Sequence, residues 1–126
     1  MGHEVVGAFD GGAVWPSGYA EHFAEEHAIS RVYDDLTEMA RDVDVATIHS
    51  CNWEFHLSRA QPFVDAGKGV LIDKPLVGNA SDASRLLAWA AAGKRVFGGS
   101  ALRWAYEVGE LRAALDTVGD RVHTVF

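Results

Sequence analysis

The sequence has little cysteine, no cluster of basic residues and no long apolar run, and each of these absences excludes a class of protein. Cys51 is the single cysteine in 126 residues, so no internal disulfide can form and a reducing, cytoplasmic location is expected. Eleven basic residues stand against 18 acidic ones, and the net charge of −7 argues against a nucleic-acid partner held through its phosphates. No apolar run approaches the roughly 20 residues of a membrane span, and the first residues lack the pattern of a signal peptide.

What the chain does contain is enough apolar sequence for one globular domain. Hydrophobic residues make up 48 % of the chain and charged residues 23 %, which is the balance of an ordinary soluble protein. Short β-branched runs predict strands at residues 5–9, 32–33, 43–48, 69–72, 95–97 and 121–126. Helices are expected at residues 19–27, 36–42, 54–66, 82–92 and 102–116, with a kink at Pro62.

The alternation of strands and helices with short connections defines the fold class. Such a chain order requires right-handed crossovers between parallel strands. We therefore predict an α/β fold, a doubly wound parallel sheet that helices cover on both faces.

Polar or small residues follow the carboxyl end of each main predicted strand. Open parallel sheets bind ligands beyond this edge, so these loops are the first candidates for a functional site. They contain Asp10, then Ser50-Cys51-Asn52, then Asp73-Lys74-Pro75, then Gly98-Gly99-Ser100.

Asp10 and Lys74 are the two residues in these loops whose side chains could bind a ligand or transfer a proton. The Asp10 carboxylate could accept hydrogen bonds from a ribose diol and would repel a 2′-phosphate; the alternative is a solvated aspartate in a turn. Pro75 favours an extended Lys74, whose amine could act as an acid or base in a crevice that it shares with Asp10. The alternative for Lys74 is an exposed lysine in a turn.

Histidine and cysteine in and around the loop Ser50-Cys51-Asn52 are residue types that could bind a metal ion. His49, Cys51 and His56 fit no common zinc spacing and lack a fourth ligand, so we predict no metal site. His56 lies one helical turn inside the helix after Asn52, where it could face the crevice or serve a structural role.

Four segments together resemble the family of glucose–fructose oxidoreductase, inositol dehydrogenase and the MocA rhizopine-catabolism protein. They span about residues 4–104, and their order and spacing are more specific than any one motif. The segments are Val5-Val6-Gly7-Ala8-Phe9-Asp10, then residues 31–36 with 43–48, then Asn52-Trp53-Glu54-Phe55-His56 with Ala60, then residues 66–76 with Asp73-Lys74-Pro75 in place of the family's Glu-Lys-Pro.

The resemblance implies a dehydrogenase that uses NAD, in preference to NADP, to oxidise a sugar, a cyclitol or a related small hydroxyl compound. It implies that Lys74 is the catalytic proton-transfer residue, and that Asp10, Asp73 and Arg103 bind parts of the cofactor. It also places the loop of Ser50, Cys51 and Asn52 along the cofactor, with His56 close by. Homo-oligomers are common in the family.

The sequence departs from the family pattern in ways that predict an incomplete domain. The first βα unit with its Gly-x-Gly-x-x-Gly loop is absent, and so is the C-terminal substrate domain. We assign residues 1–118 to a partial Rossmann-like NAD(P)-binding domain and residues 119–126 to the start of the first strand of that second domain. The missing strand would lie between residues 5–9 and 43–48, and the chain alone is expected to bind NAD poorly. The competing interpretation is a non-catalytic α/β nucleotide-binding or interaction module.

Overall fold

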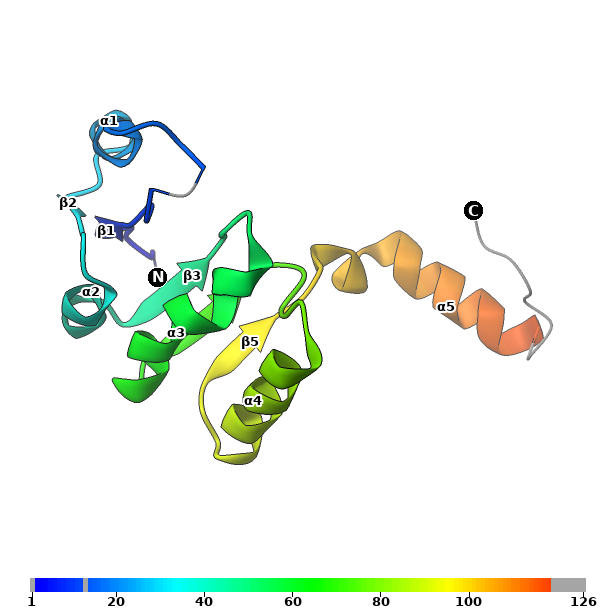
Figure 1. Ribbon diagram of the computed structural model, residues 1–126. Helices are drawn as coiled ribbons and strands as arrows, with labels where there is room; N and C mark the ends of the chain where they lie inside the picture. Colours follow the sequence, from blue (N-terminus) through cyan, green and yellow to red (C-terminus); the bar gives the residue numbers. More distant parts are fainter. Residues whose placement is uncertain (1, 13, 119–126) are drawn as a thin grey trace.

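The computed structural model describes residues 2–12 and 14–118 and contains two groups of parallel strands (Figure 1). β1 (Gly7–Ala8) pairs with β2 (Arg31–Val32) in a two-stranded sheet. β3 (Val45–Ile48), β4 (Gly69–Ile72) and β5 (Val96–Gly98) form a three-stranded sheet in that order. Every pairing is parallel, which confirms the predicted α/β class.

Helices connect the strands at nearly the predicted places. They are α1 (Tyr19–Glu26), α2 (Leu36–Asp42), α3 (His56–Asp65) and α4 (Ala80–Ala91). The side chain of Asn79 begins α4 by accepting a 2.8 Å hydrogen bond from the backbone N–H of Asp82, since a helix start leaves its first N–H groups without partners. The short 3-10 helix η1 (Trp53–Phe55) leads into α3, which continues through Pro62.

The hydrophobic core lies between one face of the three-stranded sheet and α3 and α4. Ala46, Ile48, Val70 and Ile72 point to this face, where they meet Phe63 of α3 and the other core residues. Strand side chains alternate between the two faces, so these buried positions define the covered side of the sheet. Figure 1 shows α3 and α4 together on that side.

The opposite face of this sheet is uncovered in the part of the chain that the structure describes. Val45, Leu71 and Phe97 point to it and are 61 %, 44 % and 65 % exposed. The register places Leu71 beside Phe97, so these side chains form one apolar patch. The expectation of a sheet covered on both faces is therefore wrong for the described residues, because none of their helices packs over this side.

The two sheets also do not join. β1 and β3 are each hydrogen-bonded on one edge only, and no ladder connects them within residues 2–12 and 14–118. This is the gap expected where a central strand is missing. Val6 nevertheless packs against the main core, so the edge of the core is partly closed by a side chain.

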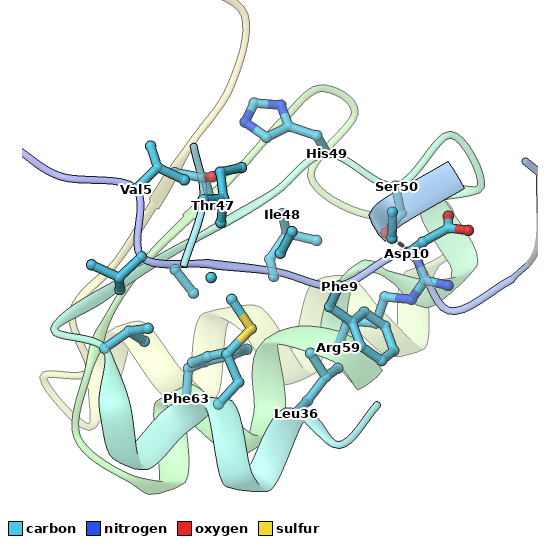
Figure 2. A pocket seen from close by; sticks show the side chains of 18 of the residues that line it. Val5, Phe9, Asp10, Leu36, Thr47, Ile48, His49, Ser50, Arg59 and Phe63 are labelled. Carbon is cyan, nitrogen blue, oxygen red and sulfur yellow. Dashed lines mark hydrogen bonds between the residues drawn. The ribbon is translucent and has the colours of Figure 1, made fainter. Parts of the chain in front are cut away.

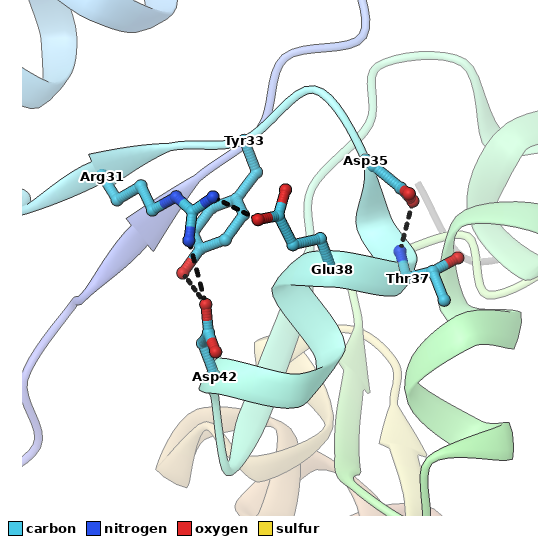
Figure 3. Close-up of polar contacts among 6 residues, drawn as sticks. All are labelled: Arg31, Tyr33, Asp35, Thr37, Glu38 and Asp42. Carbon is cyan, nitrogen blue, oxygen red and sulfur yellow. Dashed lines mark hydrogen bonds and ion pairs between the residues drawn. The ribbon is translucent and has the colours of Figure 1, made fainter.

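A polar network ties β2 to α2 (Figure 3). The hydroxyl of Tyr33 donates a 2.8 Å hydrogen bond to the Asp42 carboxylate, and Arg31 pairs with both Asp42 and Glu38. The Arg31 guanidinium also lies 4.3 Å from the centre of the Tyr33 ring. These contacts fix α2, at Glu38 and at its last residue Asp42, against the small sheet.

The predicted helix at residues 102–116 is divided. A short 3-10 helix, η2 (Ala101–Trp104), is followed by α5 (Tyr106–Val118), which projects away from both sheets (Figure 1). The division falls at Ala105, whose backbone is extended. The strand expected at residues 121–126 lies outside the described residues, and no described helix is long and apolar enough to cross a membrane.

Candidate functional site

A groove of about 1150 Å³ lies between β1 and β3, and its lining extends from the residues that precede both strands to the loops at their carboxyl ends (Figure 2). Apolar side chains from β3, α2 and α3 form its floor. Four of the predicted site residues line it, namely Asp10, Ser50, Cys51 and Asn52. The structure therefore brings the loop after β1 and the loop after β3 to one place, as the parallel topology predicted.

Arg59 of α3 holds these two loops in position. Its guanidinium donates a 2.7 Å hydrogen bond to the Oγ of Ser50, and Figure 2 shows Asp10 at the same end of the groove. The guanidinium also lies 5.5 Å from the centre of the Phe9 ring and 5.0 Å from that of Phe55. Arg59 thus places a cation beside the loops after β1 and β3.

The sequence analysis missed Arg59, although its spacing carries a signal. His56 and Arg59 are three residues apart in α3, the spacing that places two side chains on the same side of a helix. An arginine one turn after a candidate site residue was a candidate itself.

His56 contacts the loop after β3 from the core side. Its side chain is only 1 % exposed, and its Nε2–H donates a 2.8 Å hydrogen bond to the carbonyl oxygen of Ser50. Nδ1 is buried without a hydrogen-bond partner. His56 therefore supports the turn after β3 from inside the core and does not line the groove surface.

Asp73 follows β4 and faces the loop after β3. Its carboxylate oxygen lies 3.8 Å from Nδ1 of His49. A hydrogen bond from the backbone N–H of Lys74 lowers the pKa of Asp73 below its ordinary value of 3.8, against the opposing effect of desolvation, and the nearby His49 charge adds to the lowering. Asp73 is therefore an anion at neutral pH, beside the second candidate loop.

Lys74 and Arg103 lie outside the groove. Both are exposed, and neither is among the residues that line the space between β1 and β3. Arg103 is on η2, with its guanidinium 5.9 Å from the centre of the Trp104 ring. Asp10 and Lys74 therefore do not share this groove, because the open gap and the strands β3 and β4 separate the loops that carry them.

A second cavity, of about 540 Å³, lies beyond the carboxyl ends of β1 and β2. Asp10 and Asp34 provide carboxylates at its wall, and Trp15 and Tyr19 stack on each other at 4.6 Å beside it. Asp10 lines both cavities, so it is the residue that connects them.

Within the described residues, no three histidine, cysteine or acidic side chains lie close enough together to hold a metal ion. His49 and Cys51 are exposed, whereas the ring of His56 is buried beneath the loop.

Comparison with known proteins identifies a matching family. The model of an oxidoreductase family, described as an NAD-binding Rossmann fold, matches residues 3–99. This range includes every strand of the described structure and both loops at the groove.

Two similar curated proteins are vertebrate enzymes named trans-1,2-dihydrobenzene-1,2-diol dehydrogenase. The rabbit protein (Oryctolagus cuniculus) is 36 % identical over 70 residues, which is 55 % of this chain and 21 % of the relative. The zebrafish protein (Danio rerio) is 33 % identical over 90 residues, which is 68 % of this chain and 25 % of the relative. The matches thus span between a fifth and a quarter of the length of these relatives.

A solved structure supports the fold. The myo-inositol dehydrogenase from Lactobacillus casei, whose crystals contain NAD(H) and myo-inositol, superimposes with a TM-score of 0.77 at 23 % identity. The superposition covers 93 % of this chain and 34 % of that protein. At this identity the similarity establishes the fold.

Proposed function

Because this chain belongs to the oxidoreductase family with the NAD-binding Rossmann fold, we propose that it supplies part of the cofactor site of a dehydrogenase. The substrate class we propose is a sugar, a cyclitol or a related small hydroxyl compound. The single observation that carries the proposal is the family match over residues 3–99, which includes the polar loops at the carboxyl ends of parallel strands.

The residues at these loops fit the ribose portions of a dinucleotide. The Asp10 carboxylate lies between the two cavities, where it can accept hydrogen bonds from a ribose diol. Asp34 adds a second negative charge on the wall of the smaller cavity, so a 2′-phosphate would be repelled there. This charge pattern supports NAD over NADP as the cofactor.

The residues fit the pyrophosphate less well. A dinucleotide-binding loop offers backbone N–H groups at the start of a helix directly after a strand. Gly11 and Gly12 follow β1, but α1 does not begin until Tyr19, and the spacing Gly-x-Gly-x-x-Gly does not occur in the sequence. We therefore propose that the 126-residue chain binds NAD weakly by itself.

Lys74 is the proposed proton-transfer residue. Oxidation of a CH–OH group removes a hydride and a proton, and a bound nicotinamide supplies the hydride acceptor. In this proposal the Lys74 Nζ holds or moves the hydroxyl proton, while Asp73 and Arg103 lie in the segments that follow the carboxyl ends of β4 and β5. Ser50, Cys51 and Asn52 form the wall along which the cofactor would lie.

A titration followed by amide NMR tests the proposal. NAD added to millimolar concentration should shift the amides of Asp10, Ser50 and Asp73, and NADP should shift them less. An Asp10→Asn variant, which removes one negative charge, should reduce the difference between the two cofactors. Shifts confined to other parts of the chain would exclude the site, and micromolar affinity in a calorimetric titration would contradict weak binding.

The second candidate function is a non-catalytic interaction module. The uncovered apolar face of Val45, Leu71 and Phe97 favours it, since exposed patches of this kind mark binding surfaces. A Lys74→Met variant separates the two candidates, because it should abolish oxidation of a hydroxyl compound by a dehydrogenase and leave the partner binding of an interaction module unchanged.

A further inference from the structure

Arg59 lies between the two loops that line the groove, and Figure 2 shows it beside Asp10 and Ser50. On one side its Nη1–H donates the 2.7 Å hydrogen bond to the Oγ of Ser50, in the loop after β3. On the other side its guanidinium packs against the turn after β1, so closely that a Cβ added at Gly11 would lie 2.5 Å from Nη2. Gly11 also has a φ of +72°, so both its backbone and its lack of a side chain suit this contact.

The guanidinium keeps hydrogen-bonding capacity in this position. The rings of Phe9 and Phe55 hold it at 5.5 Å and 5.0 Å from their centres. An arginine side chain carries five N–H donors, and the bond to Ser50 uses one of them. Whereas Arg31 is paired with two carboxylates, Arg59 forms no ion pair within the described part of the chain. Neutral groups therefore hold its charge in place, and that charge is available to an anion.

The groove is otherwise acidic. Among the described residues that line it, Arg59 is the only arginine or lysine, and carboxylates come from Glu4, Asp10, Asp42 and Asp44. The whole chain carries a net charge of −7. A negatively charged group is therefore repelled from most of this surface and attracted to the one place where the guanidinium lies.

The place of Arg59 fits the diphosphate of a dinucleotide. In the proposed function, Asp10 accepts hydrogen bonds from one ribose and the loop of Ser50 lies along the rest of the cofactor. The diphosphate joins the two ribose groups of a dinucleotide, so it has to cross the space between these two loops. Arg59 contacts both loops, and a planar guanidinium matches two phosphate oxygens through parallel N–H donors.

We propose that the Arg59 guanidinium binds the diphosphate of the dinucleotide, an inference that rests on the proposed function for the positions of the two ribose groups. The side chain then supplies the positive charge and N–H donors that a Gly-x-Gly-x-x-Gly loop supplies from its backbone. Phe9 and Phe55 orient the guanidinium plane, and Ser50 fixes one end of it. One guanidinium replaces only part of that set of donors, so the affinity of the chain for NAD stays weak.

Inorganic pyrophosphate tests the anion site without any ribose. Added at millimolar concentration and followed by NMR, it should shift the Nε–H signal of Arg59 and the amides of Gly11 and Ser50. Arg59→Gln, which removes the charge, should weaken pyrophosphate binding about tenfold, and Arg59→Lys, which keeps a cation without the paired donors, should recover part of it. Equal binding by the parent chain and Arg59→Gln would overturn the proposal, and so would shifts confined to other parts of the chain.

Arg85→Gln is the matched control. Arg85 of α4 also lies over a ring, 5.2 Å from the centre of that of Trp89, and donates a hydrogen bond to Gln61, but it lines neither cavity. The substitution changes the net charge by the same amount, so pyrophosphate binding should stay within about twofold of the parent value. A loss as large as that in Arg59→Gln would mean that pyrophosphate responds only to net charge, and would overturn the proposal.

A comparison of ADP with adenosine separates direct contact from a structural role of Arg59. Arg59→Gln should weaken ADP binding about tenfold and leave adenosine binding nearly unchanged, because adenosine carries no phosphate. Equal weakening of both ligands would mean that Arg59 only shapes the loops, which would also overturn the proposal.

Titration with NAD distinguishes this proposal from the proposed function. Shifts at Asp10 and Ser50 that Arg59→Gln leaves unchanged would refute the role of Arg59 and support the cofactor site. Shifts at Gly11 and Ser50 that depend on Arg59, without any response at Asp10, would support the diphosphate contact and contradict the ribose site of the proposed function.

Discussion

Arg59 and Ser50 join the end of β3 to the middle of α3 through a 2.7 Å hydrogen bond from guanidinium to hydroxyl. The same guanidinium lies over the rings of Phe9 and Phe55. One side chain therefore positions the loops after β1 and β3, the two loops that line the groove.

Replacement of Arg59 tests this role. Arg59→Met removes the hydrogen bond and both ring contacts, and we expect the free energy of unfolding to fall by about 1–2 kcal/mol. Urea denaturation followed by tryptophan fluorescence measures the loss. Arg103→Met is the matched control, because Arg103 is exposed and its guanidinium lies over the neighbouring Trp104 ring, away from both loops; an equal effect of both variants would contradict the role of Arg59.

The lowered pKa of Asp73 predicts a loss of stability in acid. A group whose pKa is lower in the folded protein stabilises the fold above its unfolded pKa, and the contribution disappears as the pH falls through the folded pKa. For Asp73 this loss occurs below about pH 3.8. Asp73→Asn should flatten the stability profile in that range and leave its shape above pH 5 unchanged, which thermal unfolding at a series of pH values measures.

The raised pKa of Tyr33 predicts a loss of stability in base. Burial and its hydrogen bond to Asp42 raise the pKa of Tyr33 above its ordinary value of 10.0. A raised pKa stabilises the fold below the unfolded pKa, and the stabilisation is lost as the pH rises above 10.0. Tyr33→Phe removes this titration, so its melting temperature should depend less on pH between 9 and 11 than that of the parent chain; equal slopes would count against the assignment.

Replacement of Gly98 by alanine, which adds a single methyl group, is expected to lower the free energy of unfolding strongly. A Cβ at this position would come within 2.3 Å of the carbonyl oxygen of Ile72 on β4, and a backbone atom cannot move away cheaply. Gly98→Ala should therefore cost about 2 kcal/mol or more. Gly109→Ala is the control, since nothing lies within 4 Å of its added Cβ in α5, and it should stabilise the helix by about 0.5–1 kcal/mol. Chemical denaturation of both variants gives the comparison.

Local sequence signals were sufficient to predict most of the fold. Val70 and Ile72 lie in an apolar run with turns on both sides, and the run is β4. Asn79 with Asp82 marked the start of α4 because a short polar side chain caps the first N–H groups. What the sequence did not reveal is the uncovered face, because the exposure of Phe97 depends on which segments pack over it and not on its neighbours in sequence.

The candidate site could also be predicted only in part, because part of it depends on topology and part on packing. That Asp10 and Ser50 line one groove could be predicted because parallel strands bring their ends to one edge, which topology alone dictates. The burial of His56 and the role of Arg59 depend on how α3 is rotated against β3, and periodicity gives that rotation only approximately. The separation of Lys74 from Asp10 arises from the open gap, whose width no local pattern encodes.

The absence of a ladder between β1 and β3 also divides the cooperativity of the molecule. The hydrogen bonds of β1 with β2 can break without breaking any bond of the β3–β4–β5 sheet, whereas α2 belongs to the main core through Ala40 and its contact with α3. The segment of β1, α1 and β2 is therefore expected to melt first, so that heating produces a broad transition in two stages rather than one sharp step.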